Sequence, residues 1–204
     1  TITNAKLQIN DHQKGEYQKI AVQSLTLDKF ALDEQSHFSL ITLIKNEQVE
    51  AEISIDTDLL IDSDLNQLAL SDLIIESKVL SQALPDTTIN TSFKTDLIYQ
   101  IKNKQLNIKM ITLTTLFSGD FLTGKLDLKI NDILVLDDND LSLEALSLTG
   151  ELSGTSLENN QLNTSLKTNL TANVKNQTAK IDKFELNNTL NGETLEGELN
   201  LSFN

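Results

Sequence analysis

The chain has 204 residues, of which 30 are acidic and 16 are basic, so its formal net charge is −14. This acidic balance excludes a nucleic-acid-binding module, which needs basic side chains to neutralise phosphates, and a polybasic membrane-surface module. The absence of cysteine excludes thiol catalysis, disulfide scaffolds and cysteine-based metal centres.

Alternation of apolar and polar residues with a period of two predicts antiparallel strands through nearly the whole chain. A first hairpin is expected over residues 4–27, turning near Gly15, and strands follow around 38–43 and 49–55. The clearest alternation comes later, over residues 122–130, 162–174 and 195–203. Because successive strand side chains point to opposite faces, each strand carries one apolar and one polar face. Runs that are apolar on both faces, typical of buried parallel strands, are rare.

Segments rich in Asn, Asp and Gly separate these strands and are expected to form hairpin connections. They lie at residues 102–104, 118–120, 137–140, 175–177 and 191–193. Residues 71–84 also fit helical spacing, with a Ser/Asp cap ahead of them. We nevertheless expect a strand over 66–79, with at most a short helical turn before Pro85, because an internal repeat aligns this segment with the strand-like residues 144–150.

That repeat appears when the chain is shifted by 73 positions against itself. Residues 89–130 lie over 162–203 without a gap, and 15 of the 42 positions are identical. The identical pairs include Asn90/Asn163, Lys94/Lys167, Gly119/Gly192 and Gly124/Gly197. The chain is therefore interpreted as one continuous β-repeat domain over 1–204, with a partial unit at 1–64, a full unit at 65–137 and a nearly full unit at 138–204.

The fold expected from this pattern is all-β: a long antiparallel repeat sheet, curved into an open hydrophobic groove rather than a compact sandwich. Strands such as 162–175 would span on the order of 45 Å at about 3.3 Å per residue. Only 4% of the residues are aromatic, so the apolar face is almost entirely aliphatic and suits acyl chains. A second sheet packed on that face is the alternative, and no segment has the apolar stripe of a covering helix.

The two ends of the sequence suggest that it is part of a longer chain. The chain opens on Thr1 without a signal peptide and closes directly after the strand-like residues 199–203. No apolar run is long enough to cross a bilayer. We therefore expect a segment of a longer protein.

Several of these strands resemble the AsmA family of Gram-negative envelope proteins. The similar segments are the strand at 4–11, the hairpin that leads to 20–27, the Phe-x-Leu-x-x-Leu strand at 38–43, and the Leu-x-Gly-x-Leu-x-Leu strands at 122–128 and 195–201. The chain departs from the family pattern at Ile9, where an aromatic residue is usual, and at Ser24, where asparagine is usual.

The resemblance implies a periplasmic protein, anchored in the inner membrane by a helix outside this sequence, with a role in outer-membrane biogenesis. Its larger relatives carry phospholipid along a β-lined hydrophobic groove. The partners it implies are phospholipid or another acyl-chain lipid, envelope proteins and adjacent repeats of the parent chain. It brings no catalytic residue and no cofactor.

The residues expected to face acyl chains share an apolar side chain on the alternating face. They are Ile53, Ile55, Phe93, Leu97, Ile101, Leu122, Leu126, Leu128, Leu166, Leu170, Val174, Leu195, Leu199 and Leu201. The alternative function is an interaction scaffold, a closed β-sandwich that docks an envelope partner and binds no lipid.

Catalytic and metal sites have few candidate residues. His12 is expected in a solvated turn and His37 at an edge or in a loop, so neither suggests a base, and no phosphate loop or nucleophile elbow occurs. The acidic segments 62–64 and 137–140 could ligate calcium, but Asp and Asn also stabilise turns through their own side chains. We expect acidic turns, no metal site and no enzyme activity.

Overall fold

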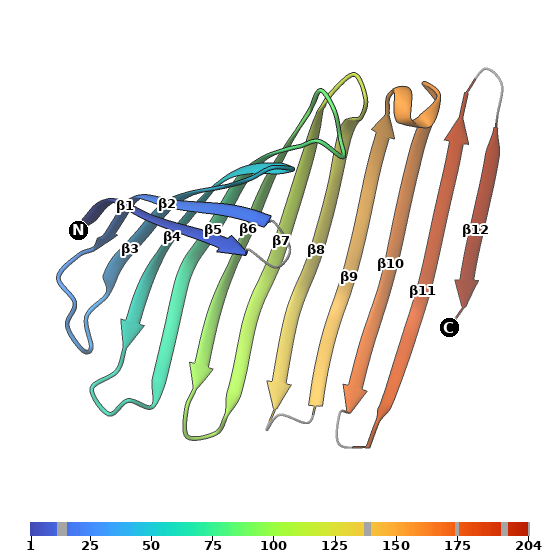
Figure 1. Cartoon of the computed structure of the whole chain (residues 1–204). Helices are drawn as coiled ribbons and strands as arrows, with labels where there is room; N and C mark the ends of the chain where they lie inside the picture. Colours follow the sequence, from blue (N-terminus) through green and yellow to red (C-terminus); the bar gives the residue numbers. More distant parts are fainter. Residues whose placement is uncertain (12–15, 137–139, 174–175, 193–195, 204) are drawn as a thin grey trace.

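The structure, a computed structural model, describes residues 1–11, 16–136, 140–173, 176–192 and 196–203. These residues form one open sheet of twelve strands, arranged in the order in which they occur along the chain (Figure 1). Each strand pairs in antiparallel fashion with the strands before and after it, so β1 and β12 are the two edges. The expectation of a long antiparallel β-sheet is confirmed.

The strands are long and of similar length over most of the sheet. The first four are β1 (Ile2–Asp11), β2 (Glu16–Leu27), β3 (Ser36–Asn46) and β4 (Val49–Ile61). The next four are β5 (Gln67–Ser81), β6 (Thr87–Gln100), β7 (Gln105–Gly119) and β8 (Thr123–Leu136). The last are β9 (Asp140–Ser153), β10 (Gln161–Asn173), β11 (Thr178–Asn191) and β12 (Gly197–Phe203). Strand β5 confirms the prediction for residues 66–79, and the short 3-10 helix η1 (Thr155–Leu157) is the one helical element among the described residues.

The connections agree only in part with the predicted Asn-, Asp- and Gly-rich segments. Residues 102–104 form the turn between β6 and β7, as predicted. The connection predicted at 118–120 begins later, because β7 continues to Gly119 and β8 begins at Thr123. Of the predicted turn at 175–177, residues 176 and 177 form a turn. Asp140 already belongs to β9 and Asn191 still belongs to β11. Gly15 and residues 137–139, 175 and 193 lie outside the described residues.

A line of irregular residues crosses the sheet from β5 to β11, at every second strand. Non-glycine residues with positive φ occur at Asp72 in β5, Met110 in β7, Ala145 in β9 and Lys183 in β11. The strand register shifts next to Asp72, Met110 and Lys183, and next to Ala145 on its β10 side. Asp72 and Ala145 are equivalent positions of the sequence repeat, and so are Met110 and Lys183. Because a bulge bends its strand and increases the local twist, this line helps to shape the sheet.

The bulges are held in place by a Thr-Asp or Thr-Asn dipeptide on the neighbouring strand. The Thr95 hydroxyl donates to the carbonyl of Lys109 (2.8 Å), and the Asp96 carboxylate accepts from the backbone N–H of Asp72 (2.8 Å). One repeat later, the equivalent bonds join Thr168 to Asp182 (3.4 Å) and Asn169 to Ala145 (3.0 Å). These side chains satisfy backbone groups that a bulge removes from the regular ladder.

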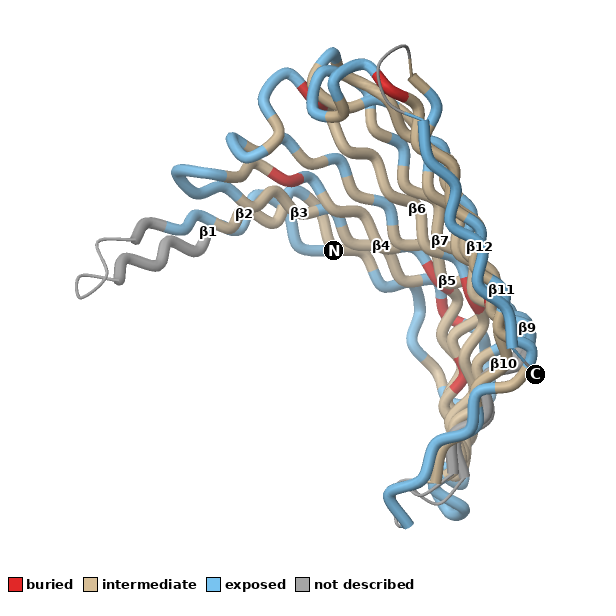
Figure 2. Tube along the Cα trace, turned by 90° about the vertical axis from the view of Figure 1, so that its right-hand side faces the viewer, coloured by how far each residue is buried: buried red, intermediate tan, exposed pale blue. Residues whose placement is uncertain are grey.

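The described strands form a single layer, and little of the chain is fully buried (Figure 2). The accessible surface is 13128 Å². A compact monomer of 22.7 kDa would expose only about 9,500 Å². Among the described residues, the buried hydrophobic side chains are those of Ala51, Ala69 and Ile130. The alternative of a closed sandwich is therefore wrong for the described residues, and the sheet neither closes nor curls strongly.

The described residues include no α-helix. They therefore contain no helix that is long and apolar enough to cross a membrane.

Candidate functional site

The candidate site is one face of the sheet, and the strand register defines it. Residues paired directly across antiparallel strands point to the same face, so a chain of pairs traces a row perpendicular to the strands. One row is apolar in all twelve strands, and we call it the central row. It consists of Ile2, Leu25, Leu40, Ile55, Ile75, Phe93, Leu113, Leu128, Leu148, Leu166, Leu186 and Leu201.

Two residues away along each strand lies a row of smaller and partly hydroxylated side chains, the small-residue row. Its members in β4–β12 are Ile53, Ser77, Thr91, Thr115, Leu126, Gly150, Thr164, Asn188 and Leu199. The hydroxyls of Thr91 and Thr115 hydrogen-bond to each other (3.2 Å). The hydroxyls of Thr91 and Thr115 therefore satisfy each other, and Ser77, Thr164 and Asn188 add further uncharged polar groups to this row.

Apolar rows lie on both sides of these two. Beyond the small-residue row, the outer row contains Ala51, Val79, Ile89, Phe117, Gly124, Leu152, Leu162 and Leu190. Beyond the bulges, the lower row contains Leu59, Leu70, Leu97, Ile108, Ile133, Leu170 and Ile181. We call the four rows together the uncharged face, because no Lys, Asp or Glu occurs in any of them.

The charged residues of the strands lie on the opposite face. The row that includes Ser54, Glu76, Ser92, Thr114 and Asp127 is almost entirely polar. Burial alone would raise the pKa of Asp127, but hydrogen bonds from Lys125 and Thr114 outweigh it and lower that pKa. The charged side chains of the polar face keep this side of the sheet hydrated.

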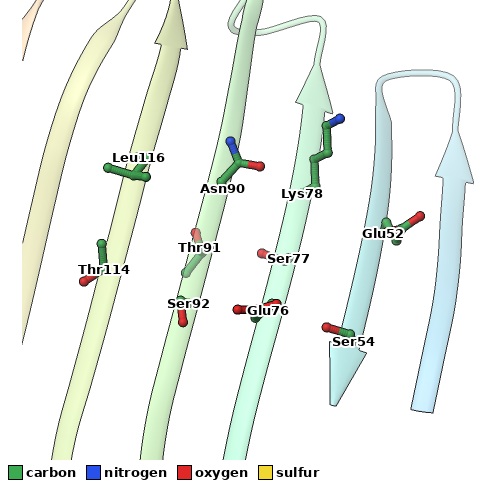
Figure 3. A pocket seen from close by; sticks show the side chains of 10 residues that line it. All are labelled: Glu52, Ser54, Glu76, Ser77, Lys78, Asn90, Thr91, Ser92, Thr114 and Leu116. Carbon is green, nitrogen blue, oxygen red and sulfur yellow. The ribbon is translucent and has the colours of Figure 1, made fainter. Parts of the chain in front are cut away.

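A depression of about 340 Å³ lies mainly on this polar face, and only Ser77 and Thr91 of its lining residues belong to the uncharged face (Figure 3). Carboxylate, hydroxyl and amide groups and the Lys78 ammonium line it, with Leu116 at one side. Its side chains come from β4, β5, β6 and β7. The uncharged face is an extended surface, whereas this depression is small and polar.

The structure brings ten of the fourteen predicted residues together on the uncharged face. They are Ile53, Ile55, Phe93, Leu97, Leu126, Leu128, Leu166, Leu170, Leu199 and Leu201. Ile101 is not on a strand, because β6 ends before it and residues 101–104 form a turn. Leu122 precedes β8, and its backbone N–H donates to the Thr87 hydroxyl (3.2 Å). Val174 and Leu195 lie outside the described residues.

Sequence reasoning missed several residues of the central row, and the bulges explain part of this. Leu70 and Ile75 both lie on the uncharged face, although their numbers have opposite parity, because the bulge at Asp72 inserts an extra residue between them. That irregular spacing also produced the helical appearance of residues 71–84. Leu113 and Leu186, which occupy equivalent positions in successive units, could have been found from the repeat.

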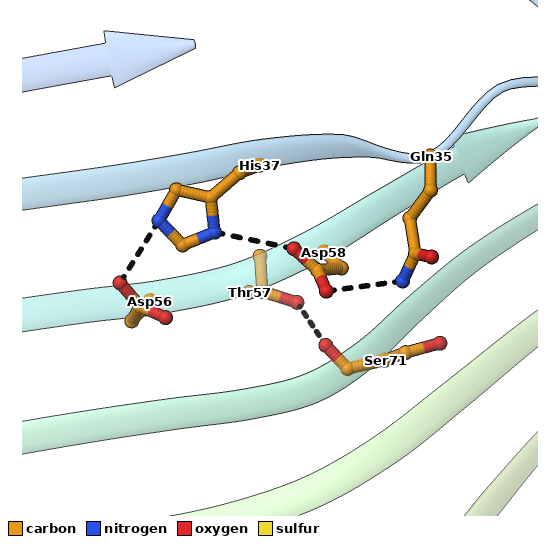
Figure 4. Close-up of polar contacts among 6 residues, drawn as sticks. All are labelled: Gln35, His37, Asp56, Thr57, Asp58 and Ser71. Atoms are coloured by element: carbon orange, nitrogen blue, oxygen red, sulfur yellow. Dashed lines mark hydrogen bonds and ion pairs between the residues drawn. The ribbon is translucent and has the colours of Figure 1, made fainter. Parts of the chain in front are cut away.

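His37 lies near the start of β3, between two carboxylates on β4 (Figure 4). Its Nδ1 is 3.1 Å from the Asp58 carboxylate and its Nε2 is 3.3 Å from Asp56. Gln35 donates to the other oxygen of Asp58 (3.0 Å). The prediction of an edge or loop position for His37 is wrong, because β3 is an inner strand paired on both sides.

The pKa of His37 is raised, first by the hydrogen bond with Asp58 and then by the negative charge of Asp56. Burial opposes this effect, while further negative charge from Asp58 and Asp28 adds to it. A general base must be neutral at its working pH, so a raised pKa works against that role. The arrangement instead favours an imidazolium held between carboxylates.

We expect His37 to stabilise the fold below neutral pH. Its pKa is higher in the folded than in the unfolded chain, so the stabilisation is fully present below about pH 6.5 and is lost as pH rises through the folded pKa. The free energy of unfolding, measured in urea, should therefore differ more between the wild type and His37→Gln at about pH 5.5 than at about pH 8.5. An equal difference at both pH values would contradict the expected stabilisation by His37. As a second test, Asp58→Asn should lower the pKa of His37 measured by NMR.

The acidic segment at 62–64 forms a turn, as expected. The Asp62 carboxylate accepts hydrogen bonds from the backbone N–H groups of Asn66 (2.6 Å) and Gln67 (2.7 Å). Within the described ranges, no group of three or more His, Asp or Glu side chains is placed to hold a metal ion. Residues 137–139 of the second acidic segment lie outside the described residues.

Comparisons of the chain with protein-family models, with characterised proteins and with solved structures find no significant match.

Proposed function

We propose that this chain binds the acyl chains of lipids on its uncharged face. The observation that carries the proposal is the four-row surface without a charged side chain, which spans the sheet from edge to edge and has no second layer over it. Apolar surface in water is unfavourable by about 25 cal/mol per Å², so a face of this size needs an apolar partner.

The chemistry of the face suits flexible hydrocarbon chains. The central row is aliphatic except for Phe93, and the other rows are mostly aliphatic, although Phe117 lies in the outer row. Phe184 and Phe203 stack on each other beside the central row at one end of the sheet. Each methylene group removed from water contributes about 0.8 kcal/mol, and contacts of this kind do not demand a fixed ligand geometry. An extended aliphatic surface can therefore bind acyl chains by their shared hydrocarbon chemistry.

The cellular setting of the proposal rests on the resemblance to the AsmA family. On that basis we propose a periplasmic segment of an envelope protein that is anchored in the inner membrane and handles phospholipid in outer-membrane biogenesis. We further propose that the open sheet bends around its ligand to form a groove. The same resemblance supports a role without catalysis.

A charge on the uncharged face should abolish acyl-chain binding. Leu126 lies in the small-residue row between Thr115 and Gly150, so Leu126→Asp places a carboxylate where the hydrocarbon would lie. We expect affinity for a fluorescent fatty acid to fall by about tenfold or more, since each tenfold step corresponds to about 1.4 kcal/mol. Fluorescence titration, with native mass spectrometry of the chain incubated with phosphatidylglycerol, measures this.

The matched control is Leu116→Asp, the same substitution on the polar face of β7. Leu116 is 43% exposed and pairs with Asn90 and Lys125, so this variant should bind like the wild type. Circular dichroism establishes that both variants are folded. If folded Leu126→Asp binds as tightly as Leu116→Asp, the acyl-chain proposal fails and a protein-docking scaffold becomes the better explanation.

A further inference from the structure

We infer that, in the absence of lipid, two copies of this chain pack their uncharged faces together to form a two-layered sandwich. The inference concerns the same surface as the proposed function but does not depend on it. Any apolar partner would shield this face from water. A second copy of the chain is present in every solution of the protein, so it is the partner available when lipid is absent. It accounts for how a single-layer sheet with few fully buried residues remains folded in water.

The surface that the single-layer sheet leaves exposed is large enough for a stable dimer. The chain exposes about 3,600 Å² more than a compact monomer of its mass. If each copy buries half of that excess, the dimer buries about 3,600 Å² in total, which falls in the range of obligate homodimers. A monomer rarely leaves a contiguous apolar patch larger than about 600 Å² in water.

The relief of the face is self-complementary. The small-residue row, with Ser77, Thr91 and Thr115 on neighbouring strands, lies between the larger side chains of the central and outer rows. A row of large side chains from one copy can lie over the small-residue row of the other. Two sheets of the same handed twist pack face to face at about 10 Å with their strands roughly aligned, which is the geometry of natural sandwiches.

Charge also favours this face over the other one. The four rows contain no ionisable side chain, so face-to-face packing desolvates no charge and opposes no like charges. The polar faces of both copies remain in water on the outside. Because each copy carries a net charge of −14, the two copies still repel each other at long range. Salt screens that repulsion, so the dimer should strengthen as ionic strength rises.

A pair of leucines on one strand tests the inference directly. Leu113 lies at the middle of the central row, whereas Leu116 lies on the polar face of the same strand, β7. After removal of bound lipid, the wild type and Leu116→Glu should have the mass of a dimer by light scattering. Leu113→Glu should be a monomer at the same concentration. If the proposed lipid binding also holds, acyl lipid should convert the wild-type dimer to monomers.

A second pair of variants decides the matter even if Leu113→Glu does not fold. The chain has no cysteine, so Thr91→Cys on the uncharged face and Ser92→Cys on the polar face each introduce a single thiol. In the dimer, the thiol at position 91 should react with a charged maleimide about tenfold more slowly than the thiol at 92, and dilution should remove the difference by mass action.

The outcomes separate this inference from its competitors. A lipid-free wild type that is monomeric overturns the inference, whether or not acyl chains bind. A dimer in which the thiol at position 91 stays as reactive as that at 92 also overturns it, because the copies then meet at the strand edges β1 or β12. A dimer that persists unchanged when acyl lipid is bound would overturn the shared-face geometry.

Discussion

Gly124→Ala is expected to lower the free energy of unfolding by about 3 kcal/mol. Gly124 has a φ of 135°, which side chains with a Cβ rarely adopt. An added Cβ would clash with the carbonyl oxygen of Glu151 and would lie 2.9 Å from the Cα of Leu152. Both are backbone atoms of β9, so the clash can be relieved only by moving β8 away from its partner.

The control for this prediction is the repeat-equivalent glycine, Gly197. No atom lies within 4 Å of the position that a Cβ on Gly197 would take. Gly197→Ala should therefore change stability by less than about 1 kcal/mol, with a slight gain because alanine restricts the unfolded chain. Urea unfolding at a fixed protein concentration measures both variants. Similar losses of stability for the two variants would show that the crowding at Gly124 does not cause the destabilisation.

Ile130→Ala is expected to lower the free energy of unfolding by about 2–4 kcal/mol, because truncating a buried isoleucine removes apolar contacts and leaves a cavity. Ile130 in β8 is only 8% exposed, although the uncharged face has no second layer. It pairs with Ile111 on β7 and lies next to the bulge line. Its loss therefore weakens the sheet where the ladder is irregular.

An isoleucine on the other face provides the comparison. Ile41 in β3 is 36% exposed and pairs with Ser24 and Ser54 on the polar face. Ile41→Ala should cost about 1 kcal/mol, mainly through lost strand preference. Because dimerisation would couple stability to concentration, unfolding is measured at two protein concentrations. Equal costs for the two isoleucines would contradict the burial seen at Ile130.

The alternation of residues was sufficient to predict which residues form strands and that the strands are antiparallel. Segments such as 122–130 and 162–173 have a strict period of two, and the side chains of a strand must alternate between its faces. Alternation failed where a bulge changes the parity. Leu70 and Ile75 share a face only because Asp72 adds a residue, and a local pattern cannot distinguish that spacing from a helical one.

The internal repeat gave information that alternation lacked. Ile53, Leu126 and Leu199 are equivalent positions in successive units, and the structure places all three in the small-residue row. Leu40, Leu113 and Leu186 are equivalent in the same way, and the structure places all three in the central row, although none of them was among the predicted residues. His37 could not have been placed in this way, because its carboxylate partners become neighbours only through the pairing of β3 with β4.

The sequence by itself determined the all-β architecture, the separation of charged from uncharged residues and the interval of the repeat, because these depend on local alternation and on self-similarity. Only the tertiary structure decided that the strands form a single open layer, because a one-sided strand looks the same whether a second sheet covers it or not. It also decided the register, which aligns one apolar residue from each of the twelve strands in the central row. Register depends on turns and bulges at many places at once.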